Sequence, residues 1–132
     1  MAAKSYYLDN AILNLVLSGT AYTPTTGNVY AALYTVAPGP SGGGTEVSTG
    51  GGTLYQRTQV IFGAPTNGVV SNSAPVAFPV AGAAWGTVHA VGLFDDQVAG
   101  NLLYFGVLGA DKVVGLGDQV NFIVGALSVT EQ

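Results

Sequence analysis

Two glycine triplets, at 42–44 and 50–52, lie in one connection that runs from Pro38 to Gly52. The stretches on both sides of it are rich in β-branched and aromatic residues and are typical of β-strands. Glycine loses more backbone entropy on ordering than any other residue, so such a connection either stays mobile or is fixed from outside. We expect this glycine-rich loop, about 38–52, to have no stable shape alone, and its fixation by a neighbouring subunit would make this an assembly protein. The feature favours a protein that works by assembly.

The rest of the chain alternates short apolar stretches with turn residues, which indicates a mainly β protein. Strands are predicted at 28–36, 54–62, 69–78, 86–94, 101–108 and 118–130, the last with a break near Gly125. The turn-rich separators are 64–68, 78–84, 95–100 and 109–117, and Asn67-Gly68 is the best hairpin signal among them. This spacing favours a single β-sandwich, jelly-roll-like, over alternating strands and helices. Because no solenoid repeat or dividing linker is present, we expect one domain over residues 1–132.

One segment, about 5–17, has helical periodicity instead. Its apolar side chains recur at spacings of three and four residues: Leu8, Ala11, Ile12, Leu15 and Val16. Ser5 is suited to the N-cap, and Gly19 to the left-handed residue just beyond the helix end. We predict one short N-terminal amphipathic helix. Its apolar face either closes one end of the sheet or docks on a partner subunit.

Charged side chains make up only 8% of the 132 residues, against about 25% in a typical soluble protein. So few charges do little to oppose self-association, which favours a homo-oligomer. The net charge is −4 with only three Lys or Arg residues, so a basic surface for nucleic acid is not expected. The chain lacks an apolar stretch of membrane-spanning length and a convincing signal peptide. We expect a soluble protein, made in a cytoplasm, that binds neither nucleic acid nor membrane.

The residues that usually carry chemistry are scattered. His89 is the single histidine and there is no cysteine, so we interpret His89 as a strand residue and not as a catalyst or ligand. Asp95-Asp96 with Gly100-Asn101 lacks the spacing of a calcium loop and is typical of a turn. No serine stands in the nucleophile-elbow motif of hydrolases. We therefore predict a protein that is not an enzyme and has no metal or other cofactor.

Arg57 stands in the predicted strand 54–62, a segment otherwise able to be half buried. Burial of an unpaired guanidinium would cost several kcal/mol, so a partner is required. Glu46, just across the glycine triplet, is the nearest candidate in the sequence. We predict a bidentate ion pair between Glu46 and Arg57 that anchors the glycine-rich loop to the sheet or to an adjoining subunit.

Several motifs run in order through nearly the whole chain: Ala32-Leu33-Tyr34-Thr35, Gly42-Gly43-Gly44-Thr45-Glu46-Val47-Ser48, Tyr55-Gln56-Arg57, Trp85-Gly86-Thr87-Val88, Phe94-Asp95, Gly100-Asn101-Leu102-Leu103-Tyr104-Phe105-Gly106 and Gly117-Asp118. Together they resemble a family of small virion proteins of tailed bacteriophages. Members are often labelled tail-fibre or minor tail proteins and, where placed on a particle, head decoration or cement proteins. The resemblance implies a virion structural protein.

Between the two placements, capsid decoration is the leading expectation, because fibre proteins are usually longer and have repetitive shafts. A cement protein of this kind implies a homo-oligomer, usually a trimer, at the capsid surface, in contact with the major capsid protein or other virion proteins. The alternative is a tail or tail-fibre component that binds a receptor or glycan, although its strand aromatics are more typical of a core. The expected interface comprises Tyr6, Tyr7, Gly42, Gly43, Gly44, Thr45, Glu46, Val47 and Arg57.

Overall fold

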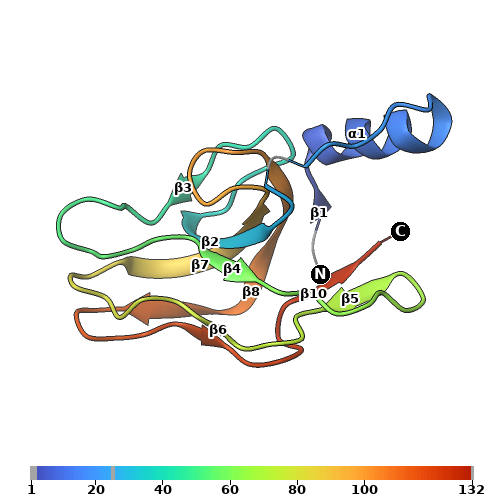
Figure 1. Ribbon diagram of the computed structural model, residues 1–132. Coiled ribbons are helices and arrows are strands. Elements are labelled where there is room, and N and C mark those ends of the chain that lie inside the picture. The colour runs from blue at the N-terminus through green and yellow to red at the C-terminus, as the bar shows by residue number, and fades with distance from the viewer. Residues whose placement is uncertain (1–2, 25, 132) are drawn as a thin grey trace.

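A computed structural model describes residues 3–24 and 26–131 of the chain. Within these residues one antiparallel sheet has the strand order β1-β8-β7-β2-β3, and β4 pairs with the outer edge of β2 beside β3. Two further antiparallel pairs, β5 with β10 and β6 with β9, lie beside this sheet (Figure 1). The elements are β1 (Ala3–Lys4), α1 (Tyr6–Leu17), β2 (Val29–Val36), β3 (Thr45–Glu46), β4 (Thr58–Val60), β5 (Val69–Ser71), β6 (Val76–Ala77), β7 (Gly86–Phe94), β8 (Leu102–Val114), β9 (Asn121–Phe122) and β10 (Ser128–Thr130).

The main core lies between one face of the large sheet and the two short strand pairs. Leu33 and Val88 contribute from β2 and β7, and Val76 and Phe122 from β6 and β9. Trp85 is buried in the same cluster, and its indole N–H donates to the carbonyl oxygen of residue 53 at 2.8 Å. A second, smaller cluster covers the other face: Ala32, Tyr34, Ala90, Phe94 and Leu102. The sheet is therefore covered on both faces, as continuous apolar strands require.

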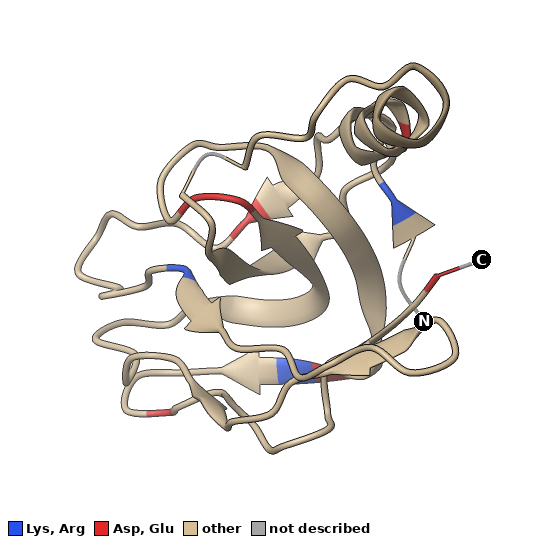
Figure 2. Ribbon diagram, turned by 45° about the vertical axis from the view of Figure 1, so that its right-hand side comes forward, with Lys and Arg blue, Asp and Glu red and all other residues tan. Residues whose placement is uncertain are grey.

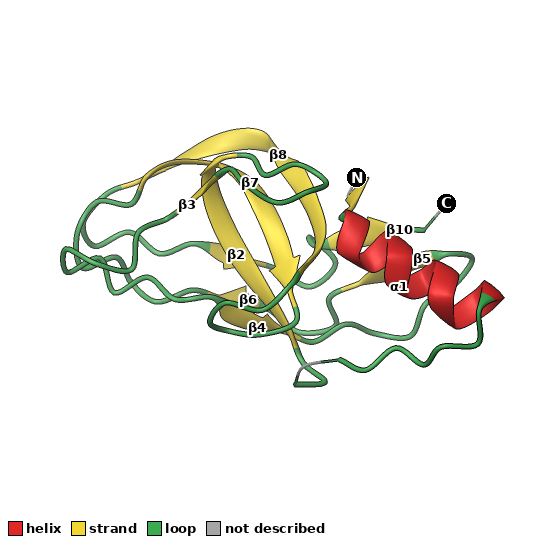
Figure 3. Ribbon diagram, turned by 90° about the horizontal axis from the view of Figure 1, so that it is seen from above, coloured by secondary structure: helices red, strands yellow, loops and turns green. Residues whose placement is uncertain are grey.

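The predicted fold class, mainly β with one short helix, is confirmed. The packing of short strand pairs against a curved sheet is compatible with a sandwich (Figure 3). The second layer consists of two separate pairs and not of one continuous sheet within the described residues. The jelly-roll description stays a prediction.

Three of the predicted strands are shorter or divided. The prediction of 54–62 as one strand is wrong, because only Thr58–Val60 pairs with β2. Predicted strands 69–78 and 118–130 each divide into two, and a single buried side chain, Asn72, occupies the break in both. Its amide nitrogen donates to the carbonyl oxygens of residues 74 and 123, and its amide oxygen accepts from the backbone N–H of residue 127. Side-chain hydrogen bonds thus replace the ladder there.

The expected turn at 109–117 is the largest error in the strand assignment. β7 runs over Gly86–Phe94 as predicted, but β8 continues through 109–114 and pairs again with the beginning of β7. The register shifts between the pairs Val88↔Lys112 and Ala90↔Val107, so β8 carries extra residues opposite His89. An irregularity of this kind bends a strand without ending it. β1 and β3, two residues each, were not expected either.

The Asn67-Gly68 turn is confirmed. Thr66 and Val69 exchange both backbone hydrogen bonds, at 2.9 and 3.0 Å, and the two residues between them have positive φ. This is the backbone geometry that Asn-Gly favours in a two-residue hairpin loop.

The helix begins and ends close to its prediction, with Ser5 as N-cap accepting from the Leu8 N–H at 3.2 Å and Gly19 at φ 67°. The expectation that its apolar face closes the sheet is wrong for most of its length. Leu8 is buried, whereas Leu15 and Val16 are exposed. The reason is visible in Figures 1 and 3, where α1 leaves the body of the molecule after its first turn. No helix in 3–24 or 26–131 is long and apolar enough to cross a membrane.

Candidate binding surface

The glycine-rich loop has a defined course, which corrects the expectation that it lacks a stable shape alone. β3, in its middle, pairs with Tyr34 and Val36 of β2. Gly44 lies so close to the preceding chain that an added Cβ would be 2.6 Å from the carbonyl oxygen of residue 36. The Pro40 carbonyl oxygen accepts from the Tyr6 N–H at 2.8 Å, which also satisfies one free donor of the helix start. Contacts within the chain therefore fix this part of the loop.

The predicted ion pair between Glu46 and Arg57 is confirmed. Arg57 Nη2 lies 2.9 Å from Glu46 Oε1, and Arg57 Nε donates to Glu46 Oε2 at 3.0 Å. The side chain of Arg57 is 11% exposed and that of Glu46 24%. This is the planar, two-bond geometry that only a guanidinium provides.

Tyr55 joins the pair from the core side. Its hydroxyl donates to Glu46 Oε2 at 2.7 Å and accepts from the Leu33 N–H at 2.9 Å. The Leu33 N–H lies at the outer edge of β2, between the segments paired with β4 and with β3. The phenol oxygen therefore fills a gap in the ladder, which explains why the predicted strand 54–62 begins only at residue 58. Tyr55 belongs to one of the motifs of the resemblance, but nothing in the sequence indicated this hydrogen-bonding role.

Burial and the charge of Glu46 shift the pKa values of the residues around the ion pair. Burial, and then the hydrogen bond to Glu46, raises the pKa of Tyr55, and burial with the negative charge of Glu46 raises the pKa of Tyr34 to about 12. Burial alone would lower the pKa of Arg57, but the hydrogen bonds and charge of Glu46 outweigh it, and the pKa is raised. Both phenols keep their protons and Arg57 its charge across the physiological range. The cluster is a fixed anchor and not a proton donor.

Arg57 also reaches the connection between β7 and β8. Its Nη1 donates to the carbonyl oxygens of Ala99, at 2.6 Å, and Asp96, at 3.2 Å. Its guanidinium carbon lies 3.6 Å from the centre of the Phe94 ring, a cation–π contact. One side chain therefore connects the glycine-rich loop, β4 and the 95–100 turn.

Phe94 also lines a depression of about 440 Å³. Its lining includes the stacked rings of Tyr34 and Phe94, whose centroids are 6.5 Å apart. Its walls come from the helix start, the glycine-rich loop and the beginning of β8: Ser5, Tyr6, Tyr7, Pro40, Ser41, Gly42, Gly43, Gly100, Asn101 and Leu102. No side chain that is charged at neutral pH lines this aromatic depression. It can accept apolar or uncharged polar groups.

The structure brings together four of the nine expected interface residues in this depression: Tyr6, Tyr7, Gly42 and Gly43. Glu46 and Arg57 anchor the loop but do not line the depression, Gly44 is packed against the chain, and Thr45 is exposed. Val47 is buried in the main core at 4% exposure. An interface role for these residues stays a prediction.

A second surface, which the sequence analysis missed, carries four glutamines. A groove of about 540 Å³ is lined by Tyr30, Gln56, Arg57, Thr58, Gln59, Ala77, Phe78, Pro79, Gln97 and Gln119. The side-chain amides of Gln59, Gln97 and Gln119 donate to the side chain of residue 28 and to the carbonyl oxygens of residues 57 and 78. These bonds orient the amides of this glutamine groove. Gln97 and Gln119 are far in the sequence from Gln56 and Gln59, so no local motif could have indicated the groove.

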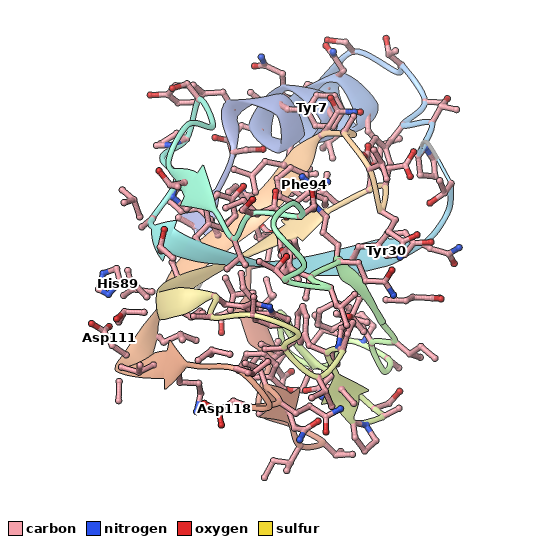
Figure 4. The ribbon with its side chains drawn as sticks, turned by 90° about the vertical axis from the view of Figure 1, so that its left-hand side faces the viewer. Tyr7, Tyr30, His89, Phe94, Asp111 and Asp118 are labelled. Atoms are coloured by element: carbon pink, nitrogen blue, oxygen red, sulfur yellow. The ribbon has the colours of Figure 1, made fainter. Side chains whose placement is uncertain are left out.

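His89 and Asp111 form a pair at the bend of β8, with Nδ1 and Oδ1 2.6 Å apart (Figure 4). Both side chains are about half exposed. The buried Asp95 accepts from the backbone and side-chain amides of Asn101, as expected for a turn. In the part of the chain that the structure describes, no group of three or more His, Cys, Asp or Glu residues is placed to hold a metal ion.

Comparison with known proteins gives one family. The model of the family described as podophage GP4 fiber I protein gp80 matches residues 3–130. A search of curated proteins gave no match.

Proposed function

Since this chain belongs to the family of the podophage GP4 fiber I protein gp80, we propose that it is a structural component of a phage tail fibre. The match covers residues 3–130 and is the observation that carries the proposal. It supports a phage virion structural protein, and it favours the fibre alternative over capsid decoration, the leading expectation from the sequence. The proposed location is accordingly the tail of the virion, after synthesis in the host cytoplasm.

We propose that the protein acts by packing against copies of itself and against other virion proteins, and not by catalysis. The anchoring of the glycine-rich loop supports this role, because Glu46, Tyr55 and Arg57 hold that loop rigidly over the sheet. A rigid loop loses little entropy when a partner binds it. The aromatic depression then offers a preformed, uncharged site for an apolar or polar side chain of a partner.

Labelling of intact virions tests the placement. Antibody against the purified chain, coupled to gold and viewed by electron microscopy, is expected to mark the tail. Label spread over the head would overturn the fibre proposal in favour of capsid decoration. Label on neither structure would overturn a virion role altogether.

The glutamine groove supports a second candidate function, binding of a glycan by the fibre component. Oriented amides provide hydrogen bonds for sugar hydroxyls, and Tyr30 at the groove wall provides a ring face. Gln56→Ala combined with Gln59→Ala is expected to abolish binding of the host's purified surface polysaccharide, measured by calorimetry. Leu116→Ala is the control and is expected to leave binding unchanged, because Leu116 is 74% exposed and lies outside the lining of the groove. Absence of binding by the unmodified chain would exclude this function.

A further inference from the structure

The outer face of α1 carries a stripe of side chains that the rest of the chain does not cover. Tyr6, Leu13 and Leu17 are 60%, 53% and 76% exposed, and Asn10 lies between Tyr6 and Leu13 on the same face. We call these four residues the α1 stripe. Figures 1 and 3 show the helix standing clear of the sheet beyond its first turn.

The spacing of the α1 stripe is that of a helix packed on another helix. Its members follow one another at intervals of four, three and four residues. Over less than two heptads these intervals fit a short coiled-coil seam, with Tyr6 and Leu13 at d positions and Asn10 and Leu17 at a positions. A single Asn at an a position is a known device for setting the register of such a seam.

Charge does not oppose contact between two such helices. Asp9 is the single charged residue of α1, and it faces Lys4 Nζ at 3.7 Å, to the side of the stripe. Figure 2 shows one acidic segment on the helix and no basic one. A second copy of the same helix would therefore meet it without repulsion between like charges.

The surface area is consistent with a missing partner. The accessible surface of the chain is 7012 Å², which exceeds the roughly 6,450 Å² expected for a compact monomer of this mass by about 560 Å². A standard interface buries about 800 Å² on each partner. The excess is smaller than that area, and it is the excess of a chain whose helix stands away from its sheet.

We propose that α1 of one copy packs in parallel against α1 of a second copy along the α1 stripe. The parallel direction follows from Asn10. In a parallel pair Asn10 faces Asn10, so the two amides can bond to each other, whereas an antiparallel pair would place Asn10 opposite Leu13 and bury the amide without a partner. This inference gives the fibre component a partner, and it rests on the proposed function only in placing the contact within a virion.

Cysteine cross-linking tests the contact directly, because the chain contains no cysteine. Asn10→Cys is expected to form a disulfide-linked dimer on mild oxidation, visible on a non-reducing gel. Leu15→Cys is the matched control, since Leu15 lies on the opposite side of α1 and is 50% exposed. It is expected to stay unlinked. Equal cross-linking of both variants, or of neither, would overturn the proposal.

The oligomeric state is the second test. The unmodified full chain is expected to be an oligomer by light scattering, and Leu13→Glu combined with Leu17→Glu to be a monomer. Val113→Glu with Ile123→Glu is the control, because these residues are 78% and 74% exposed and lie outside α1. It is expected to keep the oligomer. A monomeric unmodified chain, or a stripe variant of unchanged mass, would overturn the α1 contact while leaving fibre labelling, and hence the proposed function, intact.

Discussion

Arg57 makes five contacts with groups in three different segments. Its replacement should therefore lower the free energy of unfolding by more than the loss of one ion pair would. Arg57→Ala leaves the Glu46 carboxylate and the Ala99 carbonyl oxygen without this partner in a site that water reaches poorly. We expect a loss of about 2 to 4 kcal/mol in the free energy of unfolding, measured by urea titration.

Arg57→Lys, compared with Arg57→Ala, separates the effect of the charge from that of the guanidinium geometry. It keeps the charge but not the planar fork, so it should recover less than half of the loss. A loss below about 0.5 kcal/mol in Arg57→Ala would show that the pair is no more than a surface ion pair.

Tyr55→Phe removes a single oxygen and retains the ring that packs edge-on against Trp85, with centroids 5.3 Å apart. The Leu33 N–H then loses its acceptor and Glu46 loses a donor. We expect a destabilisation of about 1 to 3 kcal/mol in thermal unfolding, and faster hydrogen exchange at the Leu33 amide. Unchanged exchange at Leu33 would mean that water replaces the phenol without cost.

The ion pair of Arg57 could be predicted from the sequence, whereas the hydrogen bonds of Tyr55 could not. A guanidinium in an otherwise apolar strand demands a carboxylate, and Glu46 was the nearest one, so the ion pair could be predicted. Tyr55 looked like any strand aromatic. Its role depends on a gap between β3 and β4, which arises only when the sheet forms.

Of the secondary-structure elements, the glycine-rich loop offers the sharpest comparison between neighbours. Gly43 and Gly44 both have positive φ, but a Cβ on Gly44 would meet backbone atoms at 2.6 to 2.9 Å, whereas one on Gly43 would meet nothing within 4 Å. Gly43→Ala should cost about 1 kcal/mol from backbone strain alone. Gly44→Ala should cost clearly more, because the chain from residue 36 to 38 must move as well. Equal melting temperatures would show that the loop is not packed on β2.

The two ends of the described chain are tied by a pH-sensitive contact. Glu131 accepts from Lys4 of β1 and, at 2.6 Å, from Tyr104 of β8. These hydrogen bonds, that from Lys4 first, lower the pKa of Glu131 from its ordinary value of 4.5. A carboxylate whose pKa is lower in the folded state stabilises fully above the unfolded pKa, and the effect is lost as pH falls through the folded pKa.

Glu131→Gln should therefore be less stable than the unmodified chain at neutral pH, and the difference should vanish in acid. Melting temperatures measured from neutral pH to below the folded pKa test this. The side-chain carbon shift of Glu131, followed by NMR, should titrate below pH 4.5. A titration midpoint above that value would contradict the contact.

Element boundaries could be predicted where apolar pattern and pairing agree, as in β7, and not where side chains interrupt the ladder. Asn72 divides two predicted strands through bonds that join residues more than fifty positions apart. Gly109 was predicted to lie in a turn, but it lies within β8, close to the register shift opposite His89, where the strand bends without ending. The defined course of the glycine-rich loop was not predicted for a similar reason. The number of glycines indicates the entropy cost of ordering the loop but not the contacts that offset this cost.

For the entire chain, low charge predicts self-association, which stays a prediction, and the surface proposed for it could not be located from the sequence. The apolar positions of α1 were visible, yet only the structure shows that the helix leaves the sheet after Leu8. Placement in a virion came from the motifs. The choice between head and fibre depends on the family match and not on any physical property of the residues.

The same scarcity of charge predicts how self-association responds to salt. With three cations and seven anions in 132 residues, of which the α1 stripe contains none, ion pairs can contribute little to the contact. A roughly tenfold rise in NaCl should change the association constant less than about twofold, because no charges across the contact are screened. Sodium sulfate, which strengthens apolar burial, should tighten the association. Sedimentation equilibrium measures both effects. Marked dissociation in NaCl would show that charged residues outside α1 carry the contact, since an apolar helix pair has no attraction for salt to screen.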